Sequence, residues 1–240
     1  MRKPILTLAA ALSVASLMSM DVEAQSGRWN GFYAGVHGAY IDTETSYANP
    51  TTPHQYFRGP MAGAQIGYNY QMGRWVLGAE ADVAFGGIDD FVRDGNFLTF
   101  DGKLEAMGTV RARLGYDFDG FMPYITAGLM WNRLAQGSAC PAGATRGSVC
   151  FVTGPYDVSS TETFQGFTWG FGAEYALTRN WSLKAEVLFA DLGKEDYTAT
   201  IPVAGTVTAP VWQDLDYVAR AGINYRFLIL VPSRPSADHC

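Results

Sequence analysis

Eight segments of the chain alternate apolar residues with small or polar residues at a period of two. In the segment 75–85, for example, Trp75 and Leu77 share one face, whereas Glu80 and Asp82 share the other. This is the period of a β-strand, whose successive side chains point to opposite faces. The predicted strands are 31–41, 61–71, 75–85, 103–118, 121–133, 163–176, 181–190 and 215–227. One such segment is a weak signal, but eight in series predict an all-β protein.

The connections between these segments are alternately short and long. The short connections lie at 72–74, near Asp119-Gly120 and at 177–180. The long connections lie roughly at 42–60, 86–102, 134–162 and 191–214. Outer-membrane barrels have short periplasmic turns and long outer loops, whereas a soluble meander has no reason to keep its long loops at one end. The pattern predicts an eight-stranded antiparallel up-and-down transmembrane β-barrel with short periplasmic turns and four long outer loops.

Aromatic residues gather where the predicted strands meet the short turns. They are Tyr70, Trp75, Tyr116, Phe121, Tyr175, Trp181, Tyr225 and Phe227. Tyrosine and tryptophan are enriched at membrane–water interfaces, so this placement predicts an interface girdle on the periplasmic side. The alternative is an apolar plug at one end of a soluble barrel.

The first residues have the form of an export signal. Arg2 and Lys3 precede an apolar run at 5–18, and Val22-Glu23-Ala24 fits a small-x-small cleavage site. The apolar run is shorter than the roughly 20 residues of a spanning helix, which disfavours a retained anchor. We therefore expect a signal peptide at 1–24, a barrel at 25–227 and a tail at 228–240.

Composition excludes several other functions. Charged residues are 17% of the chain, below the roughly 25% of soluble domains, and the net charge is −6 with no cluster of Lys and Arg. Nucleic acid is therefore not an expected partner, because phosphate binding needs such clusters. Cys140 and Cys150 could form a disulfide in an exported chain. No CxxC pair occurs, so no metal site is expected.

Ten charged residues are predicted to point into the barrel. They are Glu80, Asp82, Glu105, Arg111, Arg113, Glu174, Lys184, Glu186, Arg220 and Arg226. An eight-stranded barrel is only wide enough for its own side chains, so we expect a paired charge network that plugs the lumen. The alternative is a narrow ion path lined by both signs of charge.

An enzyme is not expected. Catalysis by a nucleophile needs a base held beside it, and the histidines are only His37, on a predicted strand, His54, in a loop, and His239, in the tail. No cofactor is expected, although haem binding through His37, His54, Tyr47 or Tyr56 stays open. A soluble periplasmic barrel that binds an apolar ligand is the remaining alternative. Its narrow lumen would have to hold many Trp, Tyr and Phe side chains.

Four stretches resemble the Omp25/Omp31-type outer-membrane proteins of alphaproteobacteria, which are OmpA-like eight-stranded barrels. They are GFYAGVHGAY at 31–40, TVRARLGYDFDGFMPYITAGL at 109–129, WGFGAEYALTRNWSLKAEVLFADLG at 169–193 and DYVARAGINYRF at 216–227. The resemblance implies a protein of the Gram-negative outer membrane that supports envelope integrity and presents surface loops to host or phage ligands. It also implies contact with outer-membrane lipid, lipopolysaccharide and the assembly machinery. Some members of the family are said to pass solutes or bind haem.

The chain departs from the family pattern at its end. Members usually finish on an aromatic residue that the assembly machinery recognises. Phe227 stands where that residue is expected, and LILVPSRPSADHC follows it.

Overall fold

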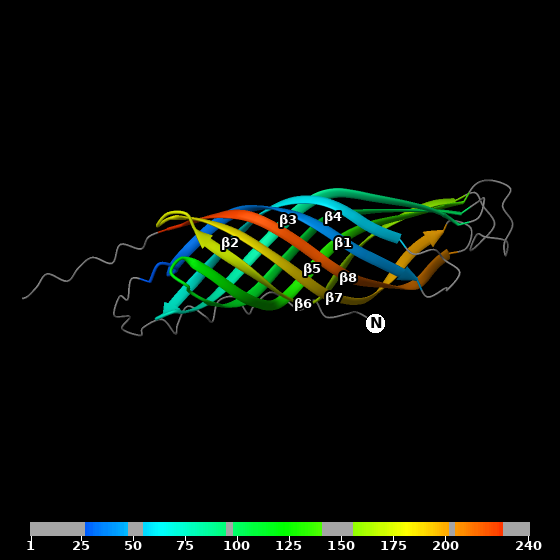
Figure 1. Ribbon diagram of the computed structural model, residues 1–240. Helices are drawn as coiled ribbons and strands as arrows, with labels where there is room; N and C mark the ends of the chain where they lie inside the picture. Colours follow the sequence, from blue (N-terminus) through cyan, green and yellow to red (C-terminus); the bar gives the residue numbers. More distant parts are fainter. Residues whose placement is uncertain (1–26, 48–54, 95–97, 141–155, 202–204, 228–240) are drawn as a thin grey trace, which may run out of the picture.

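The computed structural model describes residues 27–47, 55–94, 98–140, 156–201 and 205–227, in which the chain forms eight antiparallel strands. The strands are β1 (Gly31–Tyr47), β2 (Gln55–Met72), β3 (Trp75–Asp94), β4 (Leu98–Tyr116), β5 (Phe121–Cys140), β6 (Tyr156–Ala176), β7 (Trp181–Ile201) and β8 (Gly205–Arg226). Each strand pairs with the next, and β1 pairs with β8, which closes the barrel (Figure 1). The predicted eight-stranded barrel is confirmed. Nowhere in the described ranges is there a helix with the length and hydropathy of a membrane span.

The strands are much longer than the sequence pattern predicted. They run for 17 to 22 residues, and β-pairing continues through most of the segments predicted as long loops. Thr45 pairs with Gln55, and Ile201 pairs with Gly205. The prediction of four long outer loops was therefore wrong in extent. The apolar-outward pattern ends before the pairing does, because the outer face of a strand needs apolar side chains only where it meets lipid.

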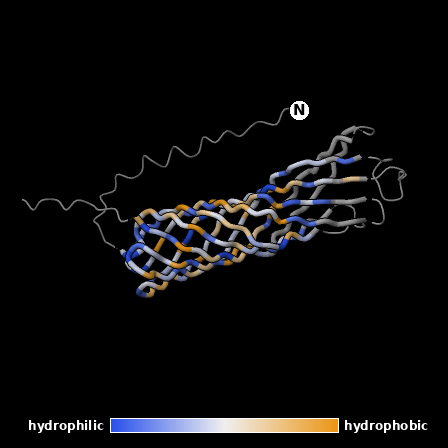
Figure 2. The backbone as a smooth tube through the Cα atoms, turned by 90° about the horizontal axis from the view of Figure 1, so that it is seen from above, coloured by the Kyte–Doolittle hydropathy of each residue, from blue (hydrophilic) through white to orange (hydrophobic). Residues whose placement is uncertain are grey.

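The two halves of the barrel have opposite polarity. In the half nearer the short turns, outward residues such as Ile66 and Leu129 are apolar and exposed, while inward residues such as Arg111 are charged and buried. In the other half, most inward residues are apolar and outward residues such as Arg58 and Glu105 are charged. Figure 2 shows hydrophilic residues becoming more frequent along the tube toward the end opposite the short turns.

This inversion shows where the surrounding solvent changes. An apolar exterior around a polar interior suits lipid, and a polar exterior around an apolar interior suits water. On β5 the apolar outward series runs from Phe121 to Trp131, close to the 9–11 residues of a tilted transmembrane strand. The remaining part of each strand continues the barrel beyond the bilayer, where its core is Ile41, Phe57, Leu104, Leu134, Phe164 and their apolar neighbours.

β-Bulges lie near the level where the polarity changes. The register shifts between Phe85 and Ile88 on β3 and between Leu104 and Ala106 on β4. A bulge adds one residue to a strand and so changes which side chains point inward. Leu104 and Met107 are both buried although they are three positions apart. Glu105, predicted to point into the lumen, therefore lies on the outer surface, where it pairs with Arg133 at 3.0 Å.

The core of the projecting half can be tested on one strand, β6. Phe164 points inward and is fully buried, whereas Phe167 points outward and is 55% exposed. We expect Phe164→Ala to lower the free energy of unfolding by about 3–5 kcal/mol, because it leaves a cavity in the core. Phe167→Ala is the matched control and should cost much less. The fraction of protein that runs as the folded gel band, followed over a series of urea concentrations, measures both losses. Equal losses would contradict the apolar core of the projecting half.

Candidate functional site

The middle of the lumen holds a layer of buried charges. It consists of four carboxylates and four cationic groups, from β3, β4, β6, β7 and β8, whose formal charges cancel. These residues, called here the ionic layer, are Glu80, Asp82, Arg111, Arg113, Glu174, Lys184, Glu186 and Arg220. Each is at most 6% exposed. The period-two pattern had placed all eight on inward faces, and the structure brings them into contact.

Arg111 on β4 is the centre of the ionic layer. Its Nη2 lies 2.7 Å from Glu80 Oε1 and 3.1 Å from Asp82 Oδ2 on the neighbouring strand β3. The same nitrogen lies 3.0 Å from Glu186 Oε1, and Nη1 donates to Glu186 Oε2 at 3.1 Å. Since β4 and β7 are not neighbours in the sheet, the contact between Arg111 and Glu186 crosses the lumen.

The other cations bind the same carboxylates from different sides. Lys184 Nζ lies 2.5 Å from Glu80 Oε1 and 3.4 Å from Glu186 Oε1. Arg220 Nη1 lies 2.9 Å from Asp82 Oδ2. The carboxylates Glu80, Asp82 and Glu186 thus each contact at least two cations. In a medium of low dielectric constant, burying these charges is tolerable only with such dense pairing.

A second group of contacts surrounds Arg113. Its Nη2 donates to Glu174 Oε2 at 2.6 Å, and its guanidinium lies 4.3 Å from the centre of the Tyr124 ring. Its Nη1 donates to the Tyr33 hydroxyl at 3.0 Å, and that hydroxyl donates to Glu80 Oε2 at 2.7 Å. Tyr33 therefore joins Arg113 to the charges around Arg111.

A chain of polar side chains connects Glu174 to His37. Asn224 Nδ2 donates to Glu174 Oε1 at 3.1 Å, and Gln65 Nε2 donates to Asn224 Oδ1 at 2.8 Å. Gln65 Oε1 lies 2.5 Å from Nδ1 of His37. His37 lies in the lumen as predicted, and its ring is held by an amide. Such a contact supports a structural role for this histidine.

Trp29, which the sequence pattern did not single out, lies inside the barrel at the end with the short turns. Trp29 is fully buried and packs with Val76, Met122 and Tyr124. Its backbone N–H donates to Gln71 Oε1 at 2.9 Å. Because Trp29 precedes β1, it is not part of any alternating segment. The one available signal was a tryptophan two residues before the glycine that begins a strand.

Arg226 packs against Trp29 and is separate from the ionic layer, although it was predicted to belong to the same charge network. Its guanidinium lies 4.7 Å from the centre of the Trp29 ring, a cation–π contact, and it donates a hydrogen bond to the carbonyl of Arg28. Arg226 therefore ties the end of β8 to the segment before β1.

A cluster of buried apolar side chains lies on the other side of the ionic layer. Arg220 Nη2 lies 4.0 Å from Met107 Sδ, at the boundary between the charged and apolar parts. Beyond it lie Met61, Met130, Leu134 and Phe164 with the rest of the inverted core. The lumen thus contains three layers in series: Trp29 with its neighbours, the ionic layer and the apolar layer.

The predicted interface aromatics lie on the outer surface around the end with the short turns. Trp75 meets Tyr116 edge-on with ring centroids 5.1 Å apart, and Tyr225 meets both Trp181 and Phe227 in the same manner. Tyr70, Phe121 and Tyr175 are also exposed there.

No group of three His, Cys, Asp or Glu residues suited to a metal occurs within the residues that the structure describes. Among the candidate haem ligands, Tyr56 is exposed, and its hydroxyl donates to Glu44 at 3.4 Å. Tyr56 lies near the start of β2, whereas Gln65, which contacts His37, lies nine residues further along the same strand. Tyr56 and His37 are therefore well separated. His54, Cys150, the predicted signal peptide and the tail lie outside the described residues, as do the side chains of Tyr47 and Cys140.

The turn between β4 and β5 is stabilised by Asp117. Its carboxylate accepts hydrogen bonds from the Gly120 N–H at 2.8 Å and from Gln71 Nε2 at 3.3 Å. Asp119 and Gly120 have positive φ angles of 56° and 109°, which the tight turn requires. Partial burial alone would raise the pKa of Asp117, but the hydrogen bonds to its charged form outweigh burial and lower the pKa.

The sequence and the barrel agree with known proteins. The family model described as outer membrane protein beta-barrel domain matches residues 7–227. The chain belongs to this family of outer-membrane β-barrel proteins. Within it, the chain is of the Omp25/Omp31 type and is localised to the outer membrane of a Gram-negative bacterium.

Relatives of this outer-membrane barrel cover most of the chain. The 31 kDa outer-membrane immunogenic protein of Brucella melitensis is 29% identical over 256 residues, covering 95% of this chain and 100% of the relative. The 22 kDa outer membrane protein of Rhizobium leguminosarum is 31% identical and covers 72% of this chain and 68% of the relative. The crystal structure of OprG from Pseudomonas aeruginosa has the same fold, with a TM-score of 0.53, 16% identity and coverage of 85% and 99%.

Loss of Arg111 should destabilise this outer-membrane barrel strongly. Arg111→Met leaves buried carboxylates without their central partner, and we expect the free energy of unfolding to fall by about 3–5 kcal/mol. Arg133→Met is the control, because its pair with Glu105 is exposed and contributes about 0–1 kcal/mol. Urea titration in detergent compares them, and a loss for Arg111→Met no larger than the control's would show that the ionic layer does not stabilise the fold.

Asp117 should make stability depend on pH. A carboxyl whose pKa is lowered by folding stabilises the protein above its unfolded pKa, about 3.9, and loses this effect as pH falls through the lower folded pKa. We expect Asp117→Asn to flatten the stability curve between about pH 5 and pH 2. The measurement is the fraction of protein that stays folded on heating, plotted against pH for the wild type and the variant. Identical curves for the two proteins would contradict the role of Asp117.

Proposed function

We propose that this outer-membrane protein is a structural barrel with a closed lumen, which supports the envelope and carries its outer end beyond the bilayer. The observation that carries the proposal is the cross-lumen contact of Arg111 with Glu186 at 3.0 Å. An eight-stranded barrel has room only for its own side chains, and here those side chains bind each other across the middle.

The three layers oppose ion passage for different physical reasons. An ion at the ionic layer would have to displace a partner of Arg111 or Glu80, leaving a buried charge unpaired. An ion in the apolar layer would lose most of its hydration among side chains that are largely apolar. At the periplasmic end, Trp29 and Arg226 occupy the opening. A barrier at each of three positions favours a plug over a pore.

The same contacts favour a structural role over catalysis. Each carboxylate of the ionic layer is bound by Arg or Lys, and a carboxylate held in this way is a poor general base. His37, the lumen histidine, is bound to Gln65. We therefore propose that the protein is not an enzyme and that its ionisable lumen residues hold the strands in register.

The outer end is the part of the barrel suited to contacts outside the cell. Its outward face carries charged residues such as Asp42 and Arg58, which pair at 2.7 Å. Binding residues commonly lie in connections carried on a rigid scaffold. The Brucella relatives are named immunogenic, and this supports the proposal that the outer end of this chain is presented at the cell surface. Lipid, lipopolysaccharide and the assembly machinery are its proposed partners in the membrane.

Conductance in planar lipid bilayers tests the closed lumen. We expect no steady single-channel steps from the wild-type protein. The variant Arg111→Ser/Glu186→Ser removes one charge of each sign, so the remaining ionic layer stays neutral while the central contact is lost. We expect this variant to conduct at least intermittently.

The control is Arg133→Ser/Glu105→Ser, which removes an exposed pair from the outer surface and should remain silent. A shift of the gel band on boiling shows that each protein is folded. Steady, reproducible steps from the folded wild-type protein would overturn the plug in favour of a narrow ion path.

A further inference from the structure

The barrel wall is interrupted in its projecting half. The pairing of β2 with β3 extends only to Ala62 and Phe85, although both strands continue toward the outer end (Figure 1). The pairing of β6 with β7 likewise extends only to Phe167 and Asp191. The other neighbouring strands stay paired there. In this half the described strands therefore form two four-stranded sheets, β7-β8-β1-β2 and β3-β4-β5-β6, separated by two seams.

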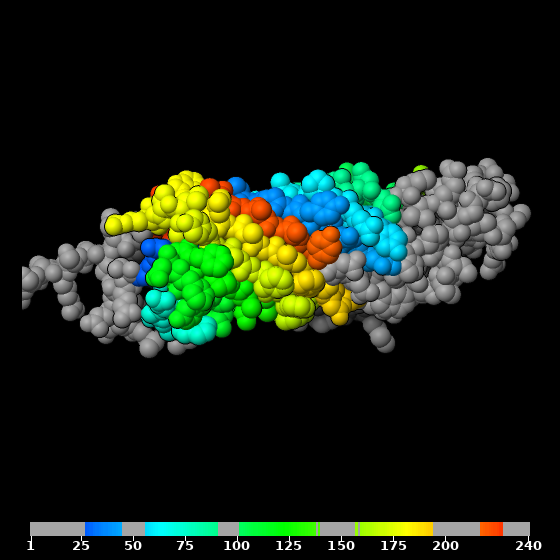
Figure 3. All heavy atoms as spheres, in the orientation of Figure 1, coloured from blue at the N-terminus to red at the C-terminus, as the bar shows by residue number. Residues whose placement is uncertain are grey.

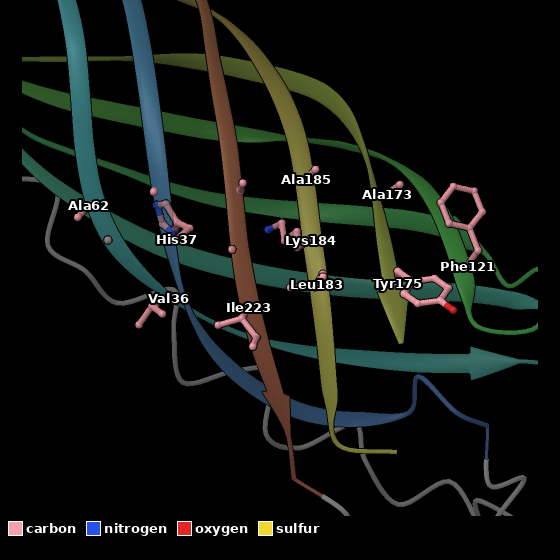
Figure 4. Close-up of a pocket in the computed structure, with 14 residues that line it drawn as sticks. Val36, His37, Ala62, Phe121, Ala173, Tyr175, Leu183, Lys184, Ala185 and Ile223 are labelled. Atoms are coloured by element: carbon pink, nitrogen blue, oxygen red, sulfur yellow. The ribbon is translucent and has the colours of Figure 1, made fainter. Parts of the chain in front are cut away.

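The seam between β6 and β7 begins at a bulge. Near the short turns the two strands lie side by side, as Figure 4 shows at Ala173 and Ala185, and the atoms of this part form a continuous surface in Figure 3. Where their pairing ends, Gly166 lies against the backbone of Leu192. Leu192 and Gly193 then stand opposite a single residue of β8, and Gly193 has a φ of 71°. Because a bulge bends its strand, β7 turns away from β6 at this point.

The unpaired edge of β6 directs backbone groups into this seam. The N–H of Ala176 donates toward β5, to Gly120, whereas the N–H of Leu177 donates toward β7, to Trp181. Backbone groups alternate in direction along a strand, and the pairing of β5 with β6 has no bulge. The odd-numbered residues of β6 therefore point their N–H and C=O groups toward the seam, where no described strand pairs with them beyond Phe167. These residues are Asp157, Ser159, Thr161, Thr163 and Gln165.

Side-chain burial shows that this edge is open. Leu134 on β5 is fully buried, but Glu162, its partner on β6, is only half-buried although it lies on the same inward face. Phe164 and Leu192 are buried at the base of the seam and belong to the apolar core. The seam thus combines unpaired backbone groups with an apolar base.

The seam between β2 and β3 is covered by its own side chains. The N–H of Tyr56 donates across it to Asp90 Oδ2 at 2.9 Å, and Gly59 lies against the side chain of Ile88. Pro60, which has no N–H, stands in this part of β2 and blunts the edge. The protected seam shows by contrast that the edge of β6 is the one available for pairing.

The open seam is acidic. From their last pair outward, β6 and β7 carry five carboxylates and one lysine, which are Asp157, Glu162, Asp191, Glu195, Asp196 and Lys194. Asp157 and Asp191 are exposed on the outward face. A cationic chain is complementary to edges of this charge.

We propose that the edge of β6 binds an extended cationic segment of another protein, which adds an antiparallel strand to the sheet. Residues of the segment whose backbone groups face β6 then point their side chains outward, on the face of Asp157 and Asp191. The intervening residues point inward, toward Phe164 and Leu192. The recognised segment therefore alternates Lys or Arg with apolar residues. The inference rests on the proposed function in one respect, that the outer end of the barrel lies outside the cell.

A second copy of this chain fits the edge poorly. It would bring an equally acidic strand against Asp157 and Glu162. Two copies in one membrane are related by an axis along the membrane normal. Because barrel strands are tilted by roughly 35–45° from the barrel axis, the two β6 edges would cross at a steep angle.

The first experiment uses the full chain folded in detergent and a fluorescent peptide of about eight residues that alternates lysine with valine. We expect saturable binding, measured by fluorescence anisotropy, that weakens as salt is added. N-methylation of the lysine backbone should weaken binding about tenfold or more, since those N–H groups face β6. N-methylation of the valine backbone should have little effect. No binding, or equal loss from the two methylated peptides, would overturn the inference.

A pair of variants tests the edge itself. Thr161→Pro/Thr163→Pro removes two N–H groups that face the seam and leaves the pairing with β5 intact, so we expect it to fold and to bind the peptide about tenfold more weakly or worse. Thr161→Ala/Thr163→Ala is the matched control, because it removes the same side chains and keeps both N–H groups. Its binding should equal that of the wild type. The shift of the gel band on boiling shows that each variant is folded.

Several outcomes would overturn the inference. Wild-type binding by the folded proline variant would place the peptide elsewhere, and loss of binding by the alanine control would assign recognition to side chains. A cross-linked dimer that only the proline variant loses would identify a second copy as the occupant. Intact cells that display the wild-type barrel should also bind the peptide. If only the purified protein binds it, the proposed orientation fails, whereas the closed lumen is tested separately by conductance.

Discussion

The structure depends on a change of solvent part-way along every strand. Where the barrel is surrounded by lipid, its exterior must be apolar, and the polar residues of each strand then face the lumen. Where the strands continue into water, a polar exterior becomes favourable and the lumen can hold an apolar core. One continuous set of hydrogen-bonded strands serves both environments, because backbone pairing is the same in each.

The layers of the lumen follow from this constraint. Polar residues that face inward in the membrane cannot stay unpaired in so narrow a space, so the carboxylates and cations around Arg111 neutralise each other. The projecting half holds no comparable charge network among the described residues because its interior is mainly apolar. At the end with the short turns, Trp29 is fully buried and packs with Arg226. The three layers are therefore stabilised in different ways: by ion pairs, by apolar packing, and by the contact between Trp29 and Arg226.

The bulges show how the chain passes from one environment to the other. At Glu105 an additional residue lets both Leu104 and Met107 point inward and sends the carboxylate to the surface. The outer surface of the membrane-spanning part is uneven for a related reason. Small residues lie side by side there where the register aligns them, as at Gly38 and Ala221.

The sequence by itself determined the number and order of the strands, the tight turns and the inward direction of the ionic layer. These properties follow from period-two alternation, which is local and survives wherever one face of a strand meets lipid. The tertiary structure decided the rest. It placed Glu105 on the outer surface, because a bulge changes the alternation of faces without changing the composition of the strand. It also extended the strands beyond the predicted limits, because a strand with a polar outer face has the composition of a loop. It also brought Trp29 to Arg226 and Arg111 to Glu186 across the lumen, because such contacts depend on barrel closure and register between strands distant in sequence, which no single segment encodes.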